Sequence, residues 1–255
     1  MKPYVLITGA YGGLGKAFAK CFARNGMNLV LLGRNAEKLS GLAREFDKTV
    51  DIITLQADVG DREQMREAAR ILKEKNIDIQ VLINNAGITY IHRFDREYDL
   101  RTYEELIRTN LHGSVYSAYY FLDGIIRNAG SIINISSVIG YAPVIGRTAY
   151  AASKFGMEGF FRVLEAEHPD IHVMMVYPTF VDTGIRSGVE GDKTVNEILT
   201  PGAVACAVWK AYTRKKRSLF LGKTAYLSYL LYKSFPRLYI RLMRKKIEKT
   251  FDNKP

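Results

Sequence analysis

Short runs of apolar residues alternate along the chain with longer segments in which apolar residues recur every three or four positions. The short runs are rich in Val, Ile and Leu. Continuous apolar runs of this length are typical of strands buried on both faces of a parallel sheet. We expect strands at residues 4–8, 28–32, 51–56, 81–84, 131–136, 171–177 and 218–222.

The longer segments have the spacing of helices with one apolar face. Strands that alternate with such helices imply right-handed β–α–β units. The predicted fold class is therefore α/β, a Rossmann-type doubly wound parallel sheet that forms a single domain over residues 1–222. A basic, aromatic helical tail is expected over residues 223–255. The expected helices of the body are 13–25, 35–48, 61–75, 103–128, 150–168 and 201–213, the last with Pro201 in its first turn.

Positive charge is concentrated near the end of the chain. The formal net charge of the 255 residues is +11, and residues 201–255 hold 14 Lys and Arg against two acidic residues. The first 200 residues are nearly balanced, which argues against a nucleic-acid binder. The two cysteines lie far apart and no Cys/His cluster has metal-ligand spacing. With no signal-peptide pattern at the start, we expect a reducing, cytoplasmic setting and no metal site.

A glycine-rich turn, residues 8–15, lies between the first predicted strand and the first predicted helix. It reads Thr8-Gly9-Ala10-Tyr11-Gly12-Gly13-Leu14-Gly15. Glycine permits tight turns and lets a pyrophosphate approach the amides of a helix N-terminus, where the helix dipole favours anions. In this position the turn predicts a dinucleotide site. The alternative is a loop that needs glycine only for positive φ.

Tyr150 and Lys154 are four residues apart, so a helix would place them on one face. A nearby positive charge favours the phenolate and lowers the pKa of a tyrosine from its usual value of about 10. A phenol tuned in this way can exchange a proton with a carbonyl or alcohol oxygen. The pair alone is a weak signal, because both residues are ordinary on helix surfaces.

Together with three further motifs, the turn and this pair make the sequence resemble the short-chain dehydrogenase/reductase family, in the branch whose chains have this length. The resemblance covers residues 3–183, and the turn fits the family's Thr-Gly-x-x-x-Gly-x-Gly pattern. The other matches are Asn84-Asn85-Ala86-Gly87, Asn110 in a helix, Ser137 thirteen residues before Tyr150, and Tyr150-Ala-Ala-Ser-Lys154. One departure is Pro178-Thr179, where the family usually has Pro-Gly, and it narrows backbone freedom beside the nicotinamide.

The resemblance implies hydride transfer between a nicotinamide and a carbonyl or secondary alcohol. Tyr150 would be the general acid/base, and Lys154 would lower its pKa and hold the nicotinamide ribose. Ser137, rather than its neighbour Ser136, would stabilise charge on the substrate oxygen. The implied catalytic set is Asn110, which would hold a water linking Lys154 to solvent, with Ser137, Tyr150 and Lys154.

The resemblance also implies the residues that would contact the cofactor. Asp58 would contact the adenine with its side chain and Val59 through its backbone, although an acid at a helix N-terminus is the alternative for Asp58. Val181 and Thr183 would contact the nicotinamide carboxamide. The implied contacts are Thr8, Gly9, Tyr11, Gly12, Gly13, Leu14, Gly15, Arg34, Asp58, Val59, Asn85, Ala86, Gly87, Tyr150, Lys154, Pro178, Val181 and Thr183.

The end of the second predicted strand favours NADP(H) over NAD(H). A carboxylate here would bind the ribose 2′-hydroxyl of NAD, whereas an arginine accommodates the 2′-phosphate of NADP. The chain has Gly33 at this position, followed by Arg34. A guanidinium makes bidentate, charge-assisted hydrogen bonds to phosphate, and glycine adds no repelling charge. The alternative is that Arg34 caps local structure and the protein accepts either cofactor.

Apolar residues dominate the two segments that meet the substrate in this family. A mainly apolar lining suits a steroid- or lipid-like alcohol or ketone, although the same side chains could pack in the core. The residues are Val138, Ile139, Tyr141, Val144 and Ile145 after the serine, and Phe180, Ile185, Val189, Ile198 and Leu199 after the sixth strand.

The tail predicts two amphipathic helices that meet near Pro236. Its longest uncharged run, Thr224 to Tyr232, is nine residues, far short of the roughly 20 that cross a bilayer. Aromatic and aliphatic side chains beside basic ones are typical of helices at a membrane surface. Residues 223–247 would therefore bind a membrane surface or pack against a second subunit, and we expect a homodimer or homotetramer.

The leading hypothesis is an NADP(H)-dependent oxidoreductase for a hydrophobic substrate. The alternative is a catalytically idle dinucleotide-binding sensor or docking protein that uses its tail to reach a partner. A sensor has no need of a tuned phenol, so the complete Ser-Tyr-Lys-Asn set favours the enzyme.

Overall fold

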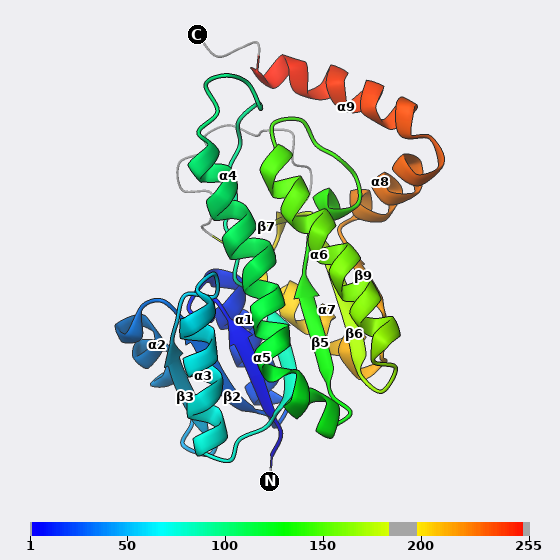
Figure 1. Ribbon diagram of the computed structural model, residues 1–255. Coiled ribbons are helices and arrows are strands. Elements are labelled where there is room, and N and C mark those ends of the chain that lie inside the picture. The colour runs from blue at the N-terminus through cyan, green and yellow to red at the C-terminus, as the bar shows by residue number, and fades with distance from the viewer. Residues whose placement is uncertain (1, 184–197, 252–255) are drawn as a thin grey trace.

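The computed structural model describes residues 2–183 and 198–251 and confirms the predicted sheet (Figure 1). Seven strands pair in the order β3-β2-β1-β4-β5-β6-β9, and all neighbours are parallel. The strands are β1 Tyr4–Thr8, β2 Asn28–Gly33, β3 Ile52–Gln56, β4 Ile79–Asn84, β5 Ser131–Ile135, β6 His172–Pro178 and β9 Ser218–Leu221. A second small sheet pairs β7 Phe180–Val181 with β8 Ile198–Leu199.

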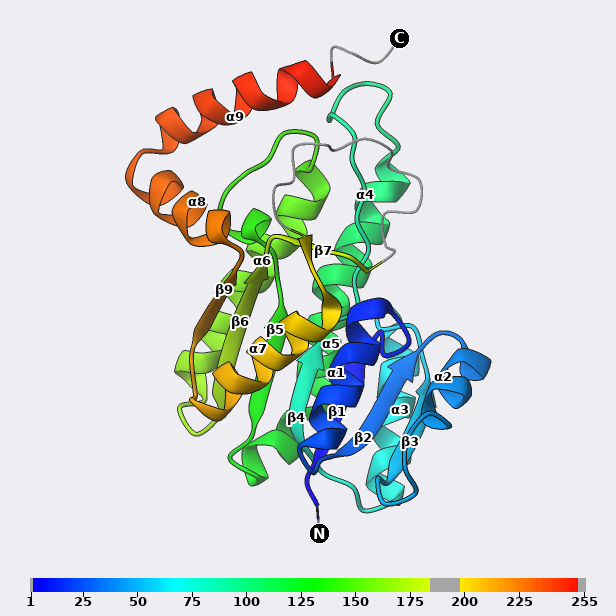
Figure 2. The same ribbon diagram turned by 180° about the vertical axis from the view of Figure 1, so that it is seen from behind.

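Helices cover both faces of the large sheet (Figures 1 and 2). Successive residues of a strand point to opposite faces, so Val5 and Ile7 of β1 pack with Phe18 on one side while Leu6 packs with Phe161 on the other. The first face carries α1 Gly13–Arg24, α2 Ala36–Ala43 and α7 Pro201–Thr213, and the second carries α3 Arg62–Glu74, α5 Gly113–Arg127 and α6 Thr148–Glu167.

The strand order reverses between β1 and β4. In doubly wound sheets, ligands bind in the crevice beyond the carboxyl ends of the strands at such a switch point. The chain runs from β1 to β2 and β3 on one side and from β4 to β5 and β6 on the other. The glycine turn after β1 and the asparagine segment after β4 therefore meet at the same edge.

Two predicted helices differ from the observed ones. The segment 103–128 is α4 Leu100–Leu106, a π-helical stretch Ile107–His112, and then α5. The helix expected to reach residue 48 ends at Ala43. After it, the Asp47 carboxylate accepts a hydrogen bond from the Thr49 backbone N–H at 2.8 Å, a local bond that competes with helix formation.

The predicted pair of tail helices is confirmed. Helix α8 spans Lys223–Ser234, and α9 spans Pro236–Phe251 with proline in its first turn. Both lie beyond the carboxyl ends of the strands, at the opposite end of the molecule from the N-terminus (Figure 1). Across residues 2–183 and 198–251, every helix is too short or too polar to cross a bilayer.

Candidate active site

The predicted catalytic residues come together where β5 ends and α6 begins. Lys154 is buried, and its ammonium donates a 2.8 Å hydrogen bond to the carbonyl of Ile135 at the end of β5. The Lys154 nitrogen lies 5.8 Å from the centre of the Tyr150 ring. This bond fixes the ammonium beside the phenol, as the four-residue spacing predicts.

Burial also changes the acidity of this lysine. Desolvation disfavours the charged form and lowers the pKa of Lys154 to about 8. Near neutral pH the side chain still carries its charge, which favours the phenolate of Tyr150. The same group can release a proton more readily than a lysine in water.

The loop after β5 presents Ser137 next to this pair. A short 3-10 helix, Val138–Gly140, follows the serine, and the Ser137 hydroxyl accepts a hydrogen bond from the Ile139 N–H at 3.3 Å. Gly140 packs on α6, because a Cβ there would lie 2.6 Å from the Ser136 hydroxyl and 3.4 Å from Lys154 Cβ. The Ser136 hydroxyl is thus buried beneath Gly140, which favours Ser137 as the residue that meets a substrate.

Arg147 is a second cation beside Tyr150 that sequence reasoning missed. Its side chain is only 7% exposed, its guanidinium carbon lies 6.0 Å from the centre of the Tyr150 ring, and it donates to the Thr89 hydroxyl. A guanidinium stays charged at any accessible pH. The only signal in the sequence is that Arg147 precedes the tyrosine by three residues, at the start of the helix.

Asn110 lies in the π-helical stretch and is fully buried. Its side-chain oxygen accepts from the Ile88 N–H at 2.8 Å, and its amide donates to the Ile88 carbonyl at 3.0 Å and to the Ser153 hydroxyl at 3.2 Å. These bonds join the segment after β4 to α6. π-Helical turns occur frequently at functional sites, and the water-holding role of Asn110 stays a prediction.

The glycine turn is packed backbone against backbone. Gly9 has a φ of +63°, and a Cβ there would lie 3.0 Å from Ala86 Cα. A Cβ on Gly15 would lie 2.3 Å from the Gly9 oxygen, and one on Gly13 would lie 3.1 Å from Thr183 Cα. The turn therefore meets the predicted contacts Ala86 and Thr183 at a distance that only glycine allows.

Thr8 and Asn85 hold this turn to the end of β4. The Thr8 hydroxyl accepts from the backbone N–H groups of Asn85 and Ala86, each at 3.0 Å. The Asn85 amide donates to the carbonyls of Thr8 at 2.9 Å and Gly9 at 3.2 Å. Because the N-cap of α1 is Gly12, no side chain occupies its first amides. The residues present therefore fit a pyrophosphate group.

The predicted cofactor-selecting corner holds a further cation and an aromatic ring. Arg34 is exposed just after β2. A Cβ on Gly33 would lie 2.6 Å from the Tyr11 ring, so an acidic side chain at this position would collide with it. The Lys38 nitrogen lies 5.7 Å from the centre of that ring. The corner thus combines positive charge with an aromatic face and leaves no room for an acidic side chain at position 33.

The remaining predicted contacts lie at the ends of β3 and β6. Asp58 accepts from the Gly60 N–H at 2.9 Å and forms an ion pair with Arg108 at 3.4 Å, while the N-cap of α3 is Asp61. Asp61, and not Asp58, is therefore the residue that caps α3, and the adenine contact of Asp58 stays a prediction. Val59 is buried beneath Gly113.

At the end of β6, Pro178 is buried and Val181 pairs with Leu199 in the small sheet. Thr179, where the family usually has glycine, faces Gly222, whose φ is +97°. A Cβ on Gly222 would lie 2.3 Å from the Thr179 hydroxyl oxygen. The departure from the family pattern is thus a contact with the start of the tail.

The apolar segment after the serine is partly exposed, as a substrate lining requires. Val138, Ile139, Val144 and Ile145 are each half-buried, whereas Tyr141 packs among aromatic rings. Beyond β6, Val181 and Leu199 pack on the core and Ile198 is 64% exposed. The predicted lining residues Ile185 and Val189 lie outside the described residues.

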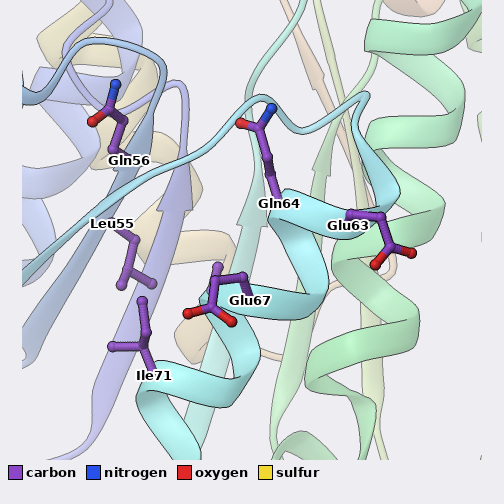
Figure 3. A pocket seen from close by; sticks show the side chains of 7 residues that line it. Leu55, Gln56, Glu63, Gln64, Glu67 and Ile71 are labelled. Carbon is purple, nitrogen blue, oxygen red and sulfur yellow. The ribbon is translucent and has the colours of Figure 1, made fainter.

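A separate hollow of about 300 Å³ lies between β3 and α3 (Figure 3). Leu55 and Ile71 form part of its apolar floor, and Glu63 and Glu67 line its rim. β2, β1 and β4 separate its strand from β5. Its acidic rim would repel a phosphate, so this hollow is distinct from the predicted cofactor site.

Comparisons with known proteins identify the family. The family model described as short chain dehydrogenase matches residues 3–194. The NADP-dependent 3-hydroxy acid dehydrogenase YdfG of Salmonella typhi is 34% identical over 80% of this chain and 87% of its own length. The chain belongs to the short-chain dehydrogenase/reductase family and is an oxidoreductase of that family.

Two further similarities concern lipid chemistry and structure. The very-long-chain 3-oxoacyl-CoA reductase of Anas platyrhynchos is 36% identical over 71% of this chain and 60% of its own length. An alcohol dehydrogenase from Thermococcus sibiricus, complexed with 5-hydroxy-NADP, superposes with a TM-score of 0.80 at 27% identity, over 87% of this chain and 96% of that one. The fold is therefore that of the family.

Proposed function

We propose that the chain transfers a hydride between NADP(H) and a carbonyl or secondary alcohol of a hydrophobic, steroid- or lipid-like substrate. The observation that carries this proposal is Tyr150 placed beside the two cations of Lys154 and Arg147. A bound nicotinamide dinucleotide supplies or accepts the hydride. A sensor without turnover, the alternative function, gives no reason to place two cations at one phenol.

The residues of the site perform the proton half of the reaction. In reduction, the Tyr150 hydroxyl gives its proton to the carbonyl oxygen, and the charge of Lys154 stabilises the phenolate that remains. The Ser137 hydroxyl donates to the same oxygen as negative charge develops on it. In oxidation, the phenolate takes the proton back. After reduction, Lys154, with its lowered pKa, gives a proton to the Tyr150 phenolate and restores the hydroxyl for the next turnover.

The variant Tyr150→Phe tests this mechanism because it removes only the hydroxyl. We expect kcat for ketone reduction to fall by about 100-fold or more, since general acid catalysis contributes roughly 10²–10⁴. The NADPH dissociation constant, measured by fluorescence, should stay unchanged. Tyr119→Phe is the control, because Tyr119 is 71% exposed on α5. Full turnover in Tyr150→Phe would contradict the proposal.

The preference for NADP(H) is supported by Arg34 and Gly33 and by the NADP-dependent relative. We expect Arg34→Ala to raise the KM for NADPH about tenfold or more, because a hydrogen bond to a charged group contributes roughly 1.5–3 kcal/mol. The KM for NADH should not change. Lys48→Ala, an exposed position beyond α2, is the control. Equal use of NADH and NADPH by the unaltered protein would contradict the preference.

The hydrophobic substrate is supported by the half-buried apolar residues after Ser137 and by the name of the long-chain reductase relative. NADPH oxidation should be screened against steroid, acyl-chain and small aromatic ketones. We expect higher kcat/KM for the steroid or acyl-chain compounds. A clear preference for small polar ketones would contradict this substrate class.

We also propose that residues 223–247 bind the anionic surface of a membrane facing the cytoplasm. Tyr226, Leu227 and Leu230 of α8 are 52%, 64% and 41% exposed. On α9, Leu238 and Leu242 are 47% and 49% exposed, among the exposed arginines that follow Pro236. Apolar side chains beside cations match an interface with anionic headgroups.

Flotation with phosphatidylserine vesicles tests this surface. The unaltered protein should bind these vesicles and lose binding in high salt or with phosphatidylcholine alone. Leu227→Glu with Leu230→Glu should abolish binding, whereas Lys48→Ala should not affect it. If the unaltered protein does not bind the vesicles, and the double variant has a smaller oligomeric mass than the unaltered protein, these residues contact a second subunit and not a membrane.

A homodimer or homotetramer is the proposed assembly. Exposed apolar side chains on α5 and α6 support it: Tyr119, Phe155, Phe160 and Val163 are exposed by 71%, 40%, 37% and 57%. Light scattering should give two or four times the 28.9 kDa mass of one chain. A strictly monomeric protein at micromolar concentration would contradict this assembly.

A further inference from the structure

Tyr141 connects the tail to the loop that carries Ser137. It follows the short helix Val138–Gly140 directly. Its hydroxyl donates a 2.5 Å hydrogen bond to the backbone carbonyl of Ala225, a fully buried residue in the first turn of α8. The loop after β5 and the tail are therefore joined by a bond that spans 84 positions of sequence.

Aromatic rings surround this bond. The centre of the Tyr141 ring lies 5.1 Å from that of Tyr177 in β6, 5.6 Å from Phe220 in β9 and 5.2 Å from Tyr229 in α8. These separations are within the range of favourable edge-to-face contacts. We call Tyr141, Tyr177, Phe220 and Tyr229 the aromatic cluster. It fixes the position of Tyr141 relative to two strands and the tail.

The other side of the same loop is closely packed at Gly140. A Cβ on Gly140 would lie 2.6 Å from the Ser136 hydroxyl oxygen and 3.4 Å from the Lys154 carbonyl oxygen. The Gly140 N–H also donates to the Ser137 carbonyl at 2.9 Å. A displacement of Tyr141 would therefore act through Gly140 on both Ser137 and Lys154.

We propose that Tyr141 is a positioning residue through which helix α8 holds the Ser137 loop in place for turnover. The tail thus contributes to the reaction from inside the molecule, in addition to any contact that it makes outside. This inference rests on the proposed function, because Ser137 must act on the substrate oxygen for its position to matter.

Tyr141→Phe tests the proposal, because it keeps the ring and removes the donor to Ala225. Tyr229→Phe is the matched control: it also keeps a ring of the aromatic cluster, and its hydroxyl accepts only a 3.2 Å bond from Lys233 one turn further along α8. We expect kcat to fall about fivefold in Tyr141→Phe, the factor that one ordinary hydrogen bond supplies. The KM for NADPH should stay constant, and Tyr229→Phe should match the unaltered protein.

Hydrogen–deuterium exchange gives a readout that needs no turnover. The Gly140 and Ala142 N–H groups bond within the loop, to the carbonyls of Ser137 and Val138. These amides should exchange faster in Tyr141→Phe and at the normal rate in Tyr229→Phe. Unchanged exchange in Tyr141→Phe, or an equal loss of kcat in both variants, would overturn the proposal. If the unaltered protein reduces no ketone, the proposed function is wrong. The exchange rates still test whether Tyr141 links α8 to the Ser137 loop.

Discussion

The glycine turn and the tail lie at the same edge of the sheet but are held in opposite ways. At the turn, backbone atoms approach so closely that a Cβ on Gly15 would lie 2.3 Å from the Gly9 oxygen. At the tail, the contact with the body is made by rings about 5 Å apart around Tyr141, and large apolar side chains such as Leu227 remain exposed.

The difference follows from the atoms that make each contact. The backbone amides of the turn are predicted to receive a pyrophosphate, and glycines keep side chains away from the closest approaches, as at Gly9 and Gly15. The tail packs on the body through aromatic side chains, and in such packing substitutions that conserve volume are tolerated best. Gly15 is therefore intolerant of an added Cβ, whereas the tail should tolerate substitutions that keep its buried rings.

The largest loss of cofactor affinity and stability is expected from Gly15→Ala, which adds a Cβ to the glycine turn. The new Cβ would meet the carbonyl oxygens of Gly9 and Ala10, so the turn must open. We expect NADPH affinity to fall by about 100-fold or more, together with a loss of stability of about 1–3 kcal/mol from overpacking. Gly41→Ala on α2, where nothing lies within 4 Å, is the control. Isothermal titration and urea unfolding measure both effects.

The next largest effect is expected from the buried Lys154. Its pKa is lowered from 10.5 in the unfolded chain to about 8 in the folded one. Between these values the unfolded chain holds more protons, so stability contributed by this group rises with pH. From pH 7.5 to pH 10.5 the free energy of unfolding should rise on the order of 3 kcal/mol more in the unaltered protein than in Lys154→Met. Urea unfolding without cofactor measures this, and a constant difference between the two proteins would contradict it.

A smaller loss of stability is expected at Gly222, the residue just before the tail, which is packed as closely as the glycine turn. With a φ of +97° and the Thr179 hydroxyl in the way, Gly222→Ala should destabilise the protein by about 1–3 kcal/mol. Adding Thr179→Gly removes the collision but not the strain. The melting temperature of the double variant should lie between those of Gly222→Ala and the unaltered protein. No recovery would show that Thr179 is not the obstacle.

The smallest change in stability is expected from Leu242→Ser on the exposed side of α9. A surface position of this kind should change the free energy of unfolding by no more than about 0.5 kcal/mol. Vesicle binding should weaken at the same time. A loss of several degrees in melting temperature would mean that the tail is held by more than its buried rings.

The sequence allowed the sheet, the family and the tail helices to be predicted because their signals are local. Apolar runs mark the strands, and Pro236 separates the two tail helices. The π-helical stretch around Asn110 was missed, since one extra residue in a helical turn leaves the periodicity of residues 103–128 almost unchanged.

Only those residues of the candidate site that belong to short sequence motifs could be predicted. Tyr150 and Lys154 lie on one helix, so their proximity follows from spacing alone. Arg147 lies three residues before Tyr150, a spacing too common to single it out, whereas the contact of Tyr141 with Ala225 depends on how the loop after β5 packs against α8. Contacts of this kind join residues far apart in the chain, and no periodic pattern records them.

The bond from Tyr141 to Ala225 also has a consequence for biosynthesis. β9 and α8 leave the ribosome after every strand of the cofactor half, and chains generally begin to fold from the N-terminal side. The glycine turn can therefore form while the serine loop still lacks its contacts with Ala225, Phe220 and Tyr229. A nascent chain would acquire its nucleotide site first and its reactive centre last.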